Sequence, residues 1–210
     1  MELDEAMRTA ATVRYYRPDP VPDEVLHRVL DTARFAPNGG NRQAWRVISV
    51  SDPATRSELR DLYLEPWQAY TAHLRTSGNP PASLEDADNF ASRLHEVPLH
   101  LVVCAHLPSL ALTDSDLDRP SIVGGASIYP FVQNLLLACR ANGLGAALTT
   151  ILAREEPRVK DLLAIPDEFA MACLVAVGYP EEARLPKRLR RAPVEEFTYR
   201  DRFGDPFVNS

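Results

Sequence analysis

The chain has 210 residues, 45% of them hydrophobic, and a formal net charge of -6 at neutral pH. This length suits one domain with a buried core and is short for two, so we expect a single domain over residues 1–210. The acidic balance argues against a nucleic-acid partner, because phosphate binding needs a basic surface and the one dense basic run is residues 187–191.

The sequence also disfavours a membrane protein and a protein stabilised by disulfide bonds. No stretch approaches the roughly 20 apolar residues of a membrane span, and the acidic first residues lack the apolar segment of a signal peptide. Cys104, Cys139 and Cys173 lie in apolar runs without CxxC spacing, which predicts buried, reduced thiols. We therefore expect a soluble, cytoplasmic protein without membrane contact.

The first predicted elements are two helices. A short helix opens the chain, and Pro22 starts a second helix that we expect Pro37 to end. Its apolar residues recur at i, i+3, i+4 and i+7, which predicts an inward face of Leu26, Val29, Leu30 and Ala33.

The turn after this helix, residues 34–46 (RFAPNGGNRQAWR), is the most informative stretch of the sequence. Two glycines remove the Cβ atoms that would hold a flat ring away, and three amide side chains offer donors and acceptors. This surface suits a polar planar heterocycle, although an ordinary helix-to-strand connection explains the turn alone equally well. The residues concerned are Asn38, Gly39, Gly40, Asn41 and Gln43.

The middle of the chain predicts two strands and a helix. Residues 45–50 and 99–105 are apolar runs typical of strands, the second dense enough for the centre of a sheet. Residues 53–70 predict a helix with an aromatic tail, and residues 76–83, with two prolines, predict a mobile loop. Residues 114–120 form an acidic loop.

The second half predicts the central core helix, at residues 123–141, which Asn142-Gly143 ends by a left-handed cap. Residues 146–152 and 169–179 predict strands, separated by a helix over residues 155–163. The apolar face of the core helix comprises Ile128, Val132, Leu135, Leu136 and Cys139.

The tail, residues 193–210, carries too many aromatic side chains for a solvated segment. We expect it to pack as an arm on a partner subunit, or alternatively around its own subunit. Its aromatic residues are Phe197, Tyr199, Phe203 and Phe207.

Several common catalytic patterns are missing from the sequence. It contains no GxSxG, HExxH or P-loop motif, and GLGAAL at residues 143–148 lacks the last glycine of a dinucleotide fingerprint. The five histidines show no repeated ligand spacing, so no metal site is expected. We interpret Glu85, Asp86 and Asp88 as a solvated helix start.

Four motifs together resemble the nitroreductase family of flavin enzymes over nearly the whole chain. They are TVRYYRPDPVP (12–22), APNGGNRQAW (36–45), GLGAALTT (143–150), and VGYP followed by LPKRLRRAP (177–193). The resemblance implies an α+β sandwich with a mostly antiparallel central sheet flanked by helices. It also implies a homodimer with exchanged C-terminal arms and two FMN molecules at the interface.

The resemblance also assigns residues to the cofactor. Thr12 and Arg14 match positions that bind the ribityl phosphate and the flavin edge. Arg191, with Arg190 beside it, matches the basic residue near the C-terminus that contacts the phosphate. Thr149 and Thr150 match residues beside the reactive ring edge, where a hydroxyl or N–H donates to flavin N5. In the family, the partner subunit contributes a turn to the flavin site. The matching residues here are Asn38, Gly39 and Gly40, with Asn41 and Gln43 following.

One departure from the family pattern concerns the phosphate. The family's leading Arg-Arg-Ser is here Ala10-Ala11-Thr12. A charged hydrogen bond contributes about 1.5–3 kcal/mol, so FMN would bind about 10- to 100-fold more weakly unless other arginines compensate. The candidates are Arg8, Arg14, Arg190 and Arg191. Residues 64–89 also show no counterpart of the deiodinase branch's Glu-Tyr-Lys lid.

The implied activity is reduction of a small acceptor, such as a nitroaromatic, a quinone or a conjugated compound, by NADPH or NADH in a ping-pong reaction. No side chain is expected to act as a nucleophile. Two alternatives stay open: a flavin oxidase or flavin-fragmenting enzyme of the same fold in a biosynthetic pathway, and a flavin-storage protein without turnover. A deazaflavin in place of FMN also stays open, and Arg42 and Arg75 are candidate contacts for a nicotinamide phosphate.

Overall fold

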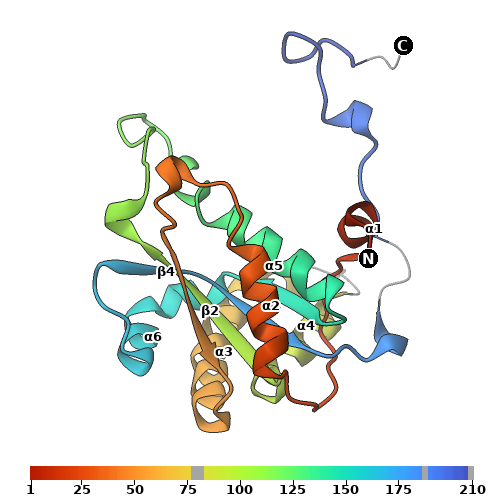
Figure 1. Cartoon of the computed structure of the whole chain (residues 1–210), viewed down its shortest axis with the longest axis vertical. Helices are drawn as coiled ribbons and strands as arrows, with labels where there is room; N and C mark the ends of the chain where they lie inside the picture. The colour runs from red at the N-terminus through yellow and green to blue at the C-terminus, as the bar shows by residue number, and fades with distance from the viewer. Residues whose placement is uncertain (77–82, 186–188, 208–210) are drawn as a thin grey trace.

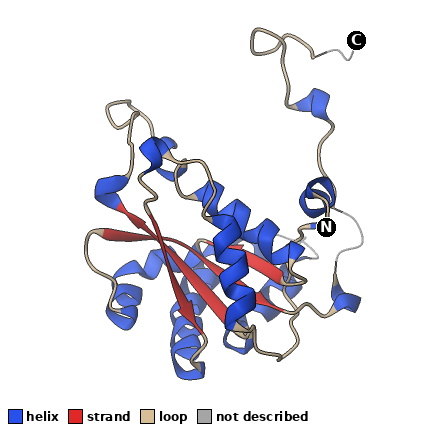
Figure 2. Ribbon diagram, in the orientation of Figure 1, coloured by secondary structure: helices blue, strands red, loops and turns tan. Residues whose placement is uncertain are grey.

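The computed structural model describes residues 1–76, 83–185 and 189–207. Its centre is a four-stranded sheet in the order β1-β2-β4-β3, in which every neighbouring pair is antiparallel (Figure 2). The strands are β1 (Trp45–Val50), β2 (Leu99–His106), β3 (Gly145–Thr149) and β4 (Phe169–Gly178). The expected α+β fold with an antiparallel sheet is therefore confirmed.

Helices cover both faces of this sheet (Figure 1). On one face, α2 (Asp23–Ala33) and α5 (Tyr129–Ala141) pack on alternate strand residues such as Leu101, Val103 and Val175. On the other face, α3 (Pro53–Thr76), α4 (Ser83–Ser92) and α6 (Glu156–Leu163) pack on the intervening residues, such as Val102 and Leu174. Because successive strand side chains point to opposite faces, apolar residues on both faces give β2 and β4 nearly continuous burial.

The short helix α1 (Leu3–Thr9) packs beside α5. The three cysteines are free and buried, as predicted. Within the three described ranges, no helix combines the length and apolar character that a membrane crossing requires.

The core helix begins later than the sequence predicted. Residues Val123–Gly125 form a separate 3₁₀ turn, and α5 starts at Tyr129. Pro130 lies in its first turn, where its missing N–H is harmless, whereas deeper in a helix the ring would clash with the preceding turn. The predicted cap is confirmed: Gly143 has a φ of 76°, and the N–H of Leu144 donates to Cys139 O at 2.9 Å.

The ends of two helices and one strand also differ from those predicted. The second helix ends at Ala33, before Pro37, and α3 continues beyond residue 70 to Thr76. The predicted strand 146–152 ends at Thr149, because Ile151–Glu155 turns into a 3₁₀ helix. The Thr149 hydroxyl accepts from the Ile151 N–H at 3.4 Å, which offers the backbone an alternative to the sheet.

Two further predictions concern the surface. The loop predicted at 76–83 falls almost wholly outside the described residues, between the end of α3 and the start of α4. Residues 193–207 extend away from the sheet and its helices (Figure 1). Phe203 is 92% exposed and Phe197 64% exposed, so this arm leaves these two aromatic side chains uncovered within one chain.

Candidate functional site

The segment after α1 lies against β3. Thr12 forms a parallel bridge with Ala146, and the N–H of Val13 donates to Ala146 O at 3.0 Å. A Cβ on Gly145 would lie 2.7 Å from Val13 Cγ2, so a glycine is needed for this close approach. The pairing holds Thr12 and Arg14 beside the free edge of β3.

A cavity of about 270 Å³ opens at this edge. It lies between the N-terminal segment, α5, β3 and residues that precede the C-terminal arm, among them Leu185 and Leu189. Its described lining contains two arginines and no carboxylate, which is notable in a chain of net charge -6. Its lining includes Arg8, Thr9, Ala10, Ala11, Thr12, Gln133, Arg140, Leu148, Leu185 and Leu189.

The two threonines assigned to the flavin ring edge lie at the end of β3. Thr149 is half-buried, and its Oγ1 lies 3.2 Å from the hydroxyl of Tyr63, which reaches it from α3. Burial raises the pKa of Tyr63, against the hydrogen bond to Thr149 and the charge of Arg14. Thr150 is exposed and precedes the 3₁₀ helix.

The glycine-rich turn after α2 has a locally constrained backbone. Gly40, Asn41 and Gln43 all have positive φ, at 62°, 53° and 48°. This conformation costs about 1–2 kcal/mol for Gln43, whereas asparagine adopts it more readily. The side chain of Asn38 compensates by accepting the Gln43 N–H at 2.9 Å, and the Gly39 N–H donates to Ser127 Oγ at 3.0 Å. The turn 38–43 therefore has a defined shape.

This turn packs beside the segment 107–127, which contains the predicted acidic loop 114–120. A Cβ on Gly39 would lie 3.2 Å from Ala111 Cβ. Within the loop, Asp114 is 4% exposed and accepts hydrogen bonds from Ser121, from Arg119 and from the backbone. These donors hold the pKa of Asp114 well below its usual range. The sequence predicted an acidic loop here but not its buried carboxylate.

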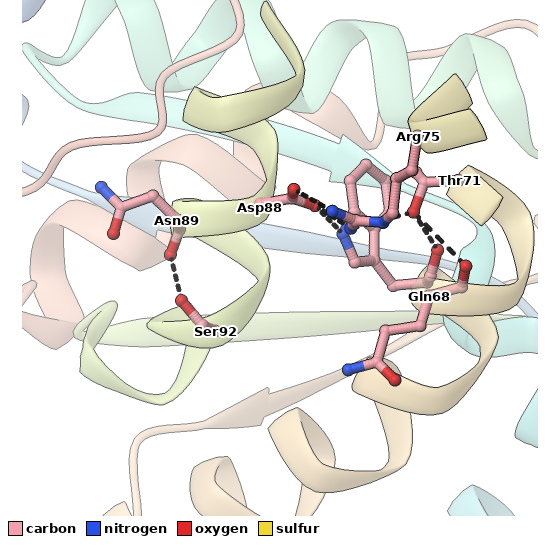
Figure 3. A network of polar contacts seen from close by, with 7 residues as sticks. Gln68, Thr71, Arg75, Asp88, Asn89 and Ser92 are labelled. Carbon is pink, nitrogen blue, oxygen red and sulfur yellow. Dashed lines mark hydrogen bonds and ion pairs between the residues drawn. The ribbon is translucent and has the colours of Figure 1, made fainter. Parts of the chain in front are cut away.

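The acidic start of α4 is also better connected than predicted. Asp88 accepts from Trp67 Nε1 at 2.8 Å and from two nitrogens of Arg75 at 2.6 and 2.7 Å, which ties α3 to α4 (Figure 3). Asp86 accepts a hydrogen bond from Tyr15. Glu85 and Asp86 are exposed in the first turn of α4, as the sequence predicted, whereas Asp88 is half-buried and paired, so the interpretation as solvated is wrong for Asp88 alone. Arg75 is engaged in this ion pair.

The two C-terminal arginines follow the cavity directly. Leu189 lines the cavity, and Arg190 and Arg191 come next with exposed side chains. Arg191 donates to the carbonyl of Arg190 at 2.7 Å. Of the predicted residues, Thr12 lines the cavity, whereas Arg14, Thr149, Thr150, Arg190 and Arg191 are not among its lining residues. Arg14 instead lines a smaller pocket that includes Tyr15 and Arg93.

The turn 38–43 is likewise not among the described lining residues of the cavity, so one chain does not bring this turn to Thr12 there. Sequence reasoning missed Tyr63, Arg140 and Gly145. The positions of Tyr63 and Arg140 within helices gave no signal, whereas Gly145 stood inside a quoted motif without an assigned role.

The sheet between two helical layers defines the class of fold, an α+β sandwich, and the comparisons define the family. The chain matches the Nitroreductase family over residues 7–179. An NADH dehydrogenase of Thermus thermophilus is 33% identical over 191 residues, 88% of each chain. A 5,6-dimethylbenzimidazole synthase of Rhodobacter capsulatus is 30% identical over 200 residues, which covers 92% of this chain and 91% of the relative.

Solved structures share the fold at lower identity. An NADPH:FMN oxidoreductase of Vibrio harveyi complexed with NAD⁺ has a TM-score of 0.71 at 19% identity, covering 99% of this chain and 79% of that one. An iodotyrosine deiodinase bound to FMN and 3-iodo-L-tyrosine has a TM-score of 0.72 at 23% identity, covering 92% and 96%. The chain belongs to the nitroreductase family and is by class an oxidoreductase.

Proposed function

We propose that this protein is an FMN-dependent oxidoreductase that uses NADPH or NADH to reduce a small acceptor by a ping-pong mechanism. The observation that supports this best is the cavity beside β3, whose described lining has arginines but no carboxylate. A cationic lining of this kind suits a phosphate group. The neighbouring threonines suit the polar edge of a flavin ring, so the residues present fit FMN.

We infer a homodimer, and the size of the cavity supports this inference. At about 270 Å³ it lies below the roughly 300–1,000 Å³ of typical small-molecule sites, so one chain supplies part of a flavin site. We infer that the partner subunit lends the turn 38–43, including Asn38, Gly39, Gly40, Asn41 and Gln43. The exposed aromatic side chains of the arm 193–207 supply apolar area for the same interface.

The protein's part in the reaction is to bind and orient. When bound, FMN supplies the hydride chemistry. Arg14, Arg190 and Arg191 would hold the phosphate by charge-assisted hydrogen bonds, with Thr12 beside them. Thr149 and Thr150 would donate hydrogen bonds at the ring edge.

The relatives' names support the nicotinamide co-substrate. They include the NADH dehydrogenase of Thermus thermophilus and a putative NAD(P)H nitroreductase of Bacillus subtilis that is 26% identical over 203 residues. By similarity we infer NAD(P)H as the reductant. The acceptor class is a nitroaromatic, a quinone or a conjugated compound.

A second candidate function has its own support. The relative named 5,6-dimethylbenzimidazole synthase covers nearly the whole chain at 30% identity. This favours flavin chemistry with oxygen in a biosynthetic pathway. Peroxide formed from a substrate alone, or loss of the flavin under oxygen, identifies this candidate, whereas acceptor-dependent oxidation of NAD(P)H identifies the reductase. Tight FMN binding without either reaction identifies a flavin-storage protein.

The binding half of the proposal is tested by titrating the apoprotein with FMN. We expect a saturable complex with one FMN per chain. Arg191→Ala should bind FMN about tenfold more weakly, the equivalent of one charged hydrogen bond, with unchanged thermal stability of the apoprotein. An unchanged affinity would remove Arg191 from the site.

A further inference from the structure

Arg140 is an arginine of the cavity without a carboxylate partner. It lies near the end of α5, half-buried, and lines the same cavity as Thr12. The ion pairs found among the described residues include none with Arg140. A cation at a concave, partly desolvated position favours an anion from outside the chain.

The guanidinium of Arg140 is held in place by α1. Its Nε donates to Thr9 Oγ1 at 3.0 Å, and the Thr9 hydroxyl in turn donates to Glu5 O at 2.7 Å. The threonine proton is thereby directed to the helix backbone, which leaves its oxygen as the acceptor for Arg140. One nitrogen of Arg140 is thus anchored, and neither Nη group donates to another of the described residues, which leaves both for a ligand.

The other arginine of the lining is differently engaged. Arg8 donates from Nε to Asp4 at 2.8 Å, so a neighbouring carboxylate shares its charge. Ala10 and Ala11, which stand where the family carries arginines, line the cavity together with Arg140. The positive charge missing from the N-terminal segment is therefore supplied to the same cavity from α5.

We propose that Arg140 binds the phosphate of the flavin and supplies the positive charge that Ala10 and Ala11 cannot provide. This inference rests on the proposed function, because that function identifies the anion as the phosphate of FMN. A phosphate carries up to two negative charges, and the planar guanidinium offers two parallel donors to it. Thr9 acts as a positioning residue for Arg140.

The test compares FMN with riboflavin, which has the same ring and ribityl chain but no phosphate. Both are titrated into apoprotein by quenching of flavin fluorescence. Arg140→Gln should weaken FMN binding about 10- to 100-fold and change riboflavin binding less than about twofold. Its FMN affinity should also depend less on salt, because one phosphate contact is gone. Arg140→Lys should retain part of the affinity.

Arg28→Gln is the matched control. Arg28 donates to Asn142 at the same end of α5 at 3.4 Å but is not part of the cavity lining, so FMN affinity should be unchanged. Thr9→Val frees Arg140 without removing charge and should give a smaller, FMN-specific loss. Thermal unfolding of each apoprotein checks that the variants fold.

Two results would overturn the proposal. Equal FMN affinity in wild type and Arg140→Gln excludes Arg140, as does an equal loss for FMN and riboflavin. Failure of the wild-type protein to bind either flavin would instead contradict the proposed function, and this inference with it.

Discussion

The hydroxyl of Tyr63 on α3 lies 3.2 Å from Oγ1 of Thr149 at the end of β3. Tyr63 is 2% exposed, and a buried phenol needs an acceptor for its proton. Among the described residues, Thr149 is the hydrogen-bond partner of this hydroxyl. Either hydroxyl can donate in this pair, and we assign Tyr63 as the donor because of its burial. With this assignment Thr149 Oγ1 accepts from Tyr63 and from the Ile151 N–H and keeps its own proton to donate outward.

Tyr63→Phe should therefore raise the reduction potential of bound FMN. Oxidised flavin N5 accepts a hydrogen bond and matches a donating Thr149, whereas reduced N5 carries hydrogen and needs an acceptor. Without the phenol, Thr149 regains a free lone pair. We expect the ratio of affinities for reduced and oxidised FMN to rise about two- to tenfold, the value of one neutral hydrogen bond.

This change is measured by equilibration with redox dyes. Tyr70→Phe, an exposed tyrosine of the same helix, is the matched control and should leave the potential unchanged. In a Thr149→Val background, Tyr63→Phe should have no effect on the potential. A shift that persists there would mean that Tyr63 acts by another route.

Gly145→Ala should destabilise the protein by about 1–3 kcal/mol through overpacking. The new Cβ would lie 2.7 to 2.9 Å from three side-chain atoms of Val13. Chemical denaturation measures the free energy that Gly145→Ala costs in the wild type and in a Val13→Ala background. The difference between the two costs is the coupling free energy of the two positions. The added methyl should cost less once Val13 is shortened, and equal costs in both backgrounds would exclude this contact as the cause.

His100 should make stability depend on pH below neutrality. It is fully buried in β2, its Nε2 lies 2.8 Å from Leu94 O, and burial lowers its pKa from 6.5 to about 4, with the positive charge of Arg56 and His95 also lowering it. Because the unfolded chain takes up the proton first, stability is full above pH 6.5 and falls until about pH 4. The loss is about 3 kcal/mol.

His100→Gln keeps a donor for Leu94 O but does not titrate, so its unfolding free energy should vary less over this pH range. Urea denaturation at several pH values makes the comparison. His27→Gln, on the exposed side of α2, should keep the wild-type dependence. The same pH dependence in His100→Gln and wild type would assign the effect to other groups.

Deleting residues 193–210 should convert a dimer into monomers. Phe197 and Phe203 are exposed in one chain, and burying both in a partner supplies several kcal/mol of association energy, at about 1.5–3 kcal/mol for each side chain. Sedimentation equilibrium measures the mass against 23.4 kDa for one chain. The same number of chains per particle before and after deletion would contradict the arm's role, and Tyr70→Glu on the body should leave that number unchanged.

The sequence predicted the fold well because its signals are local. Apolar runs such as residues 99–105 mark the strands of a sheet covered on both faces. The predicted ends of helices were less accurate where tertiary contacts decide them. The last turns of α3 carry Arg75, which pairs with Asp88 of α4. Ser127, just before α5, accepts a hydrogen bond from the Gly39 N–H. Arg140 and Tyr63 were missed because their importance arises from contacts with Thr9 and Thr149, which are distant in sequence.

The most direct test of the account is an absorbance spectrum of the protein with FMN, followed by anaerobic addition of NADPH or NADH. We expect a flavin spectrum that bleaches stoichiometrically with the nicotinamide and returns when an acceptor such as a quinone is added. Protein that fails to take up FMN, or whose bound flavin neither nicotinamide reduces, would contradict the proposed reductase.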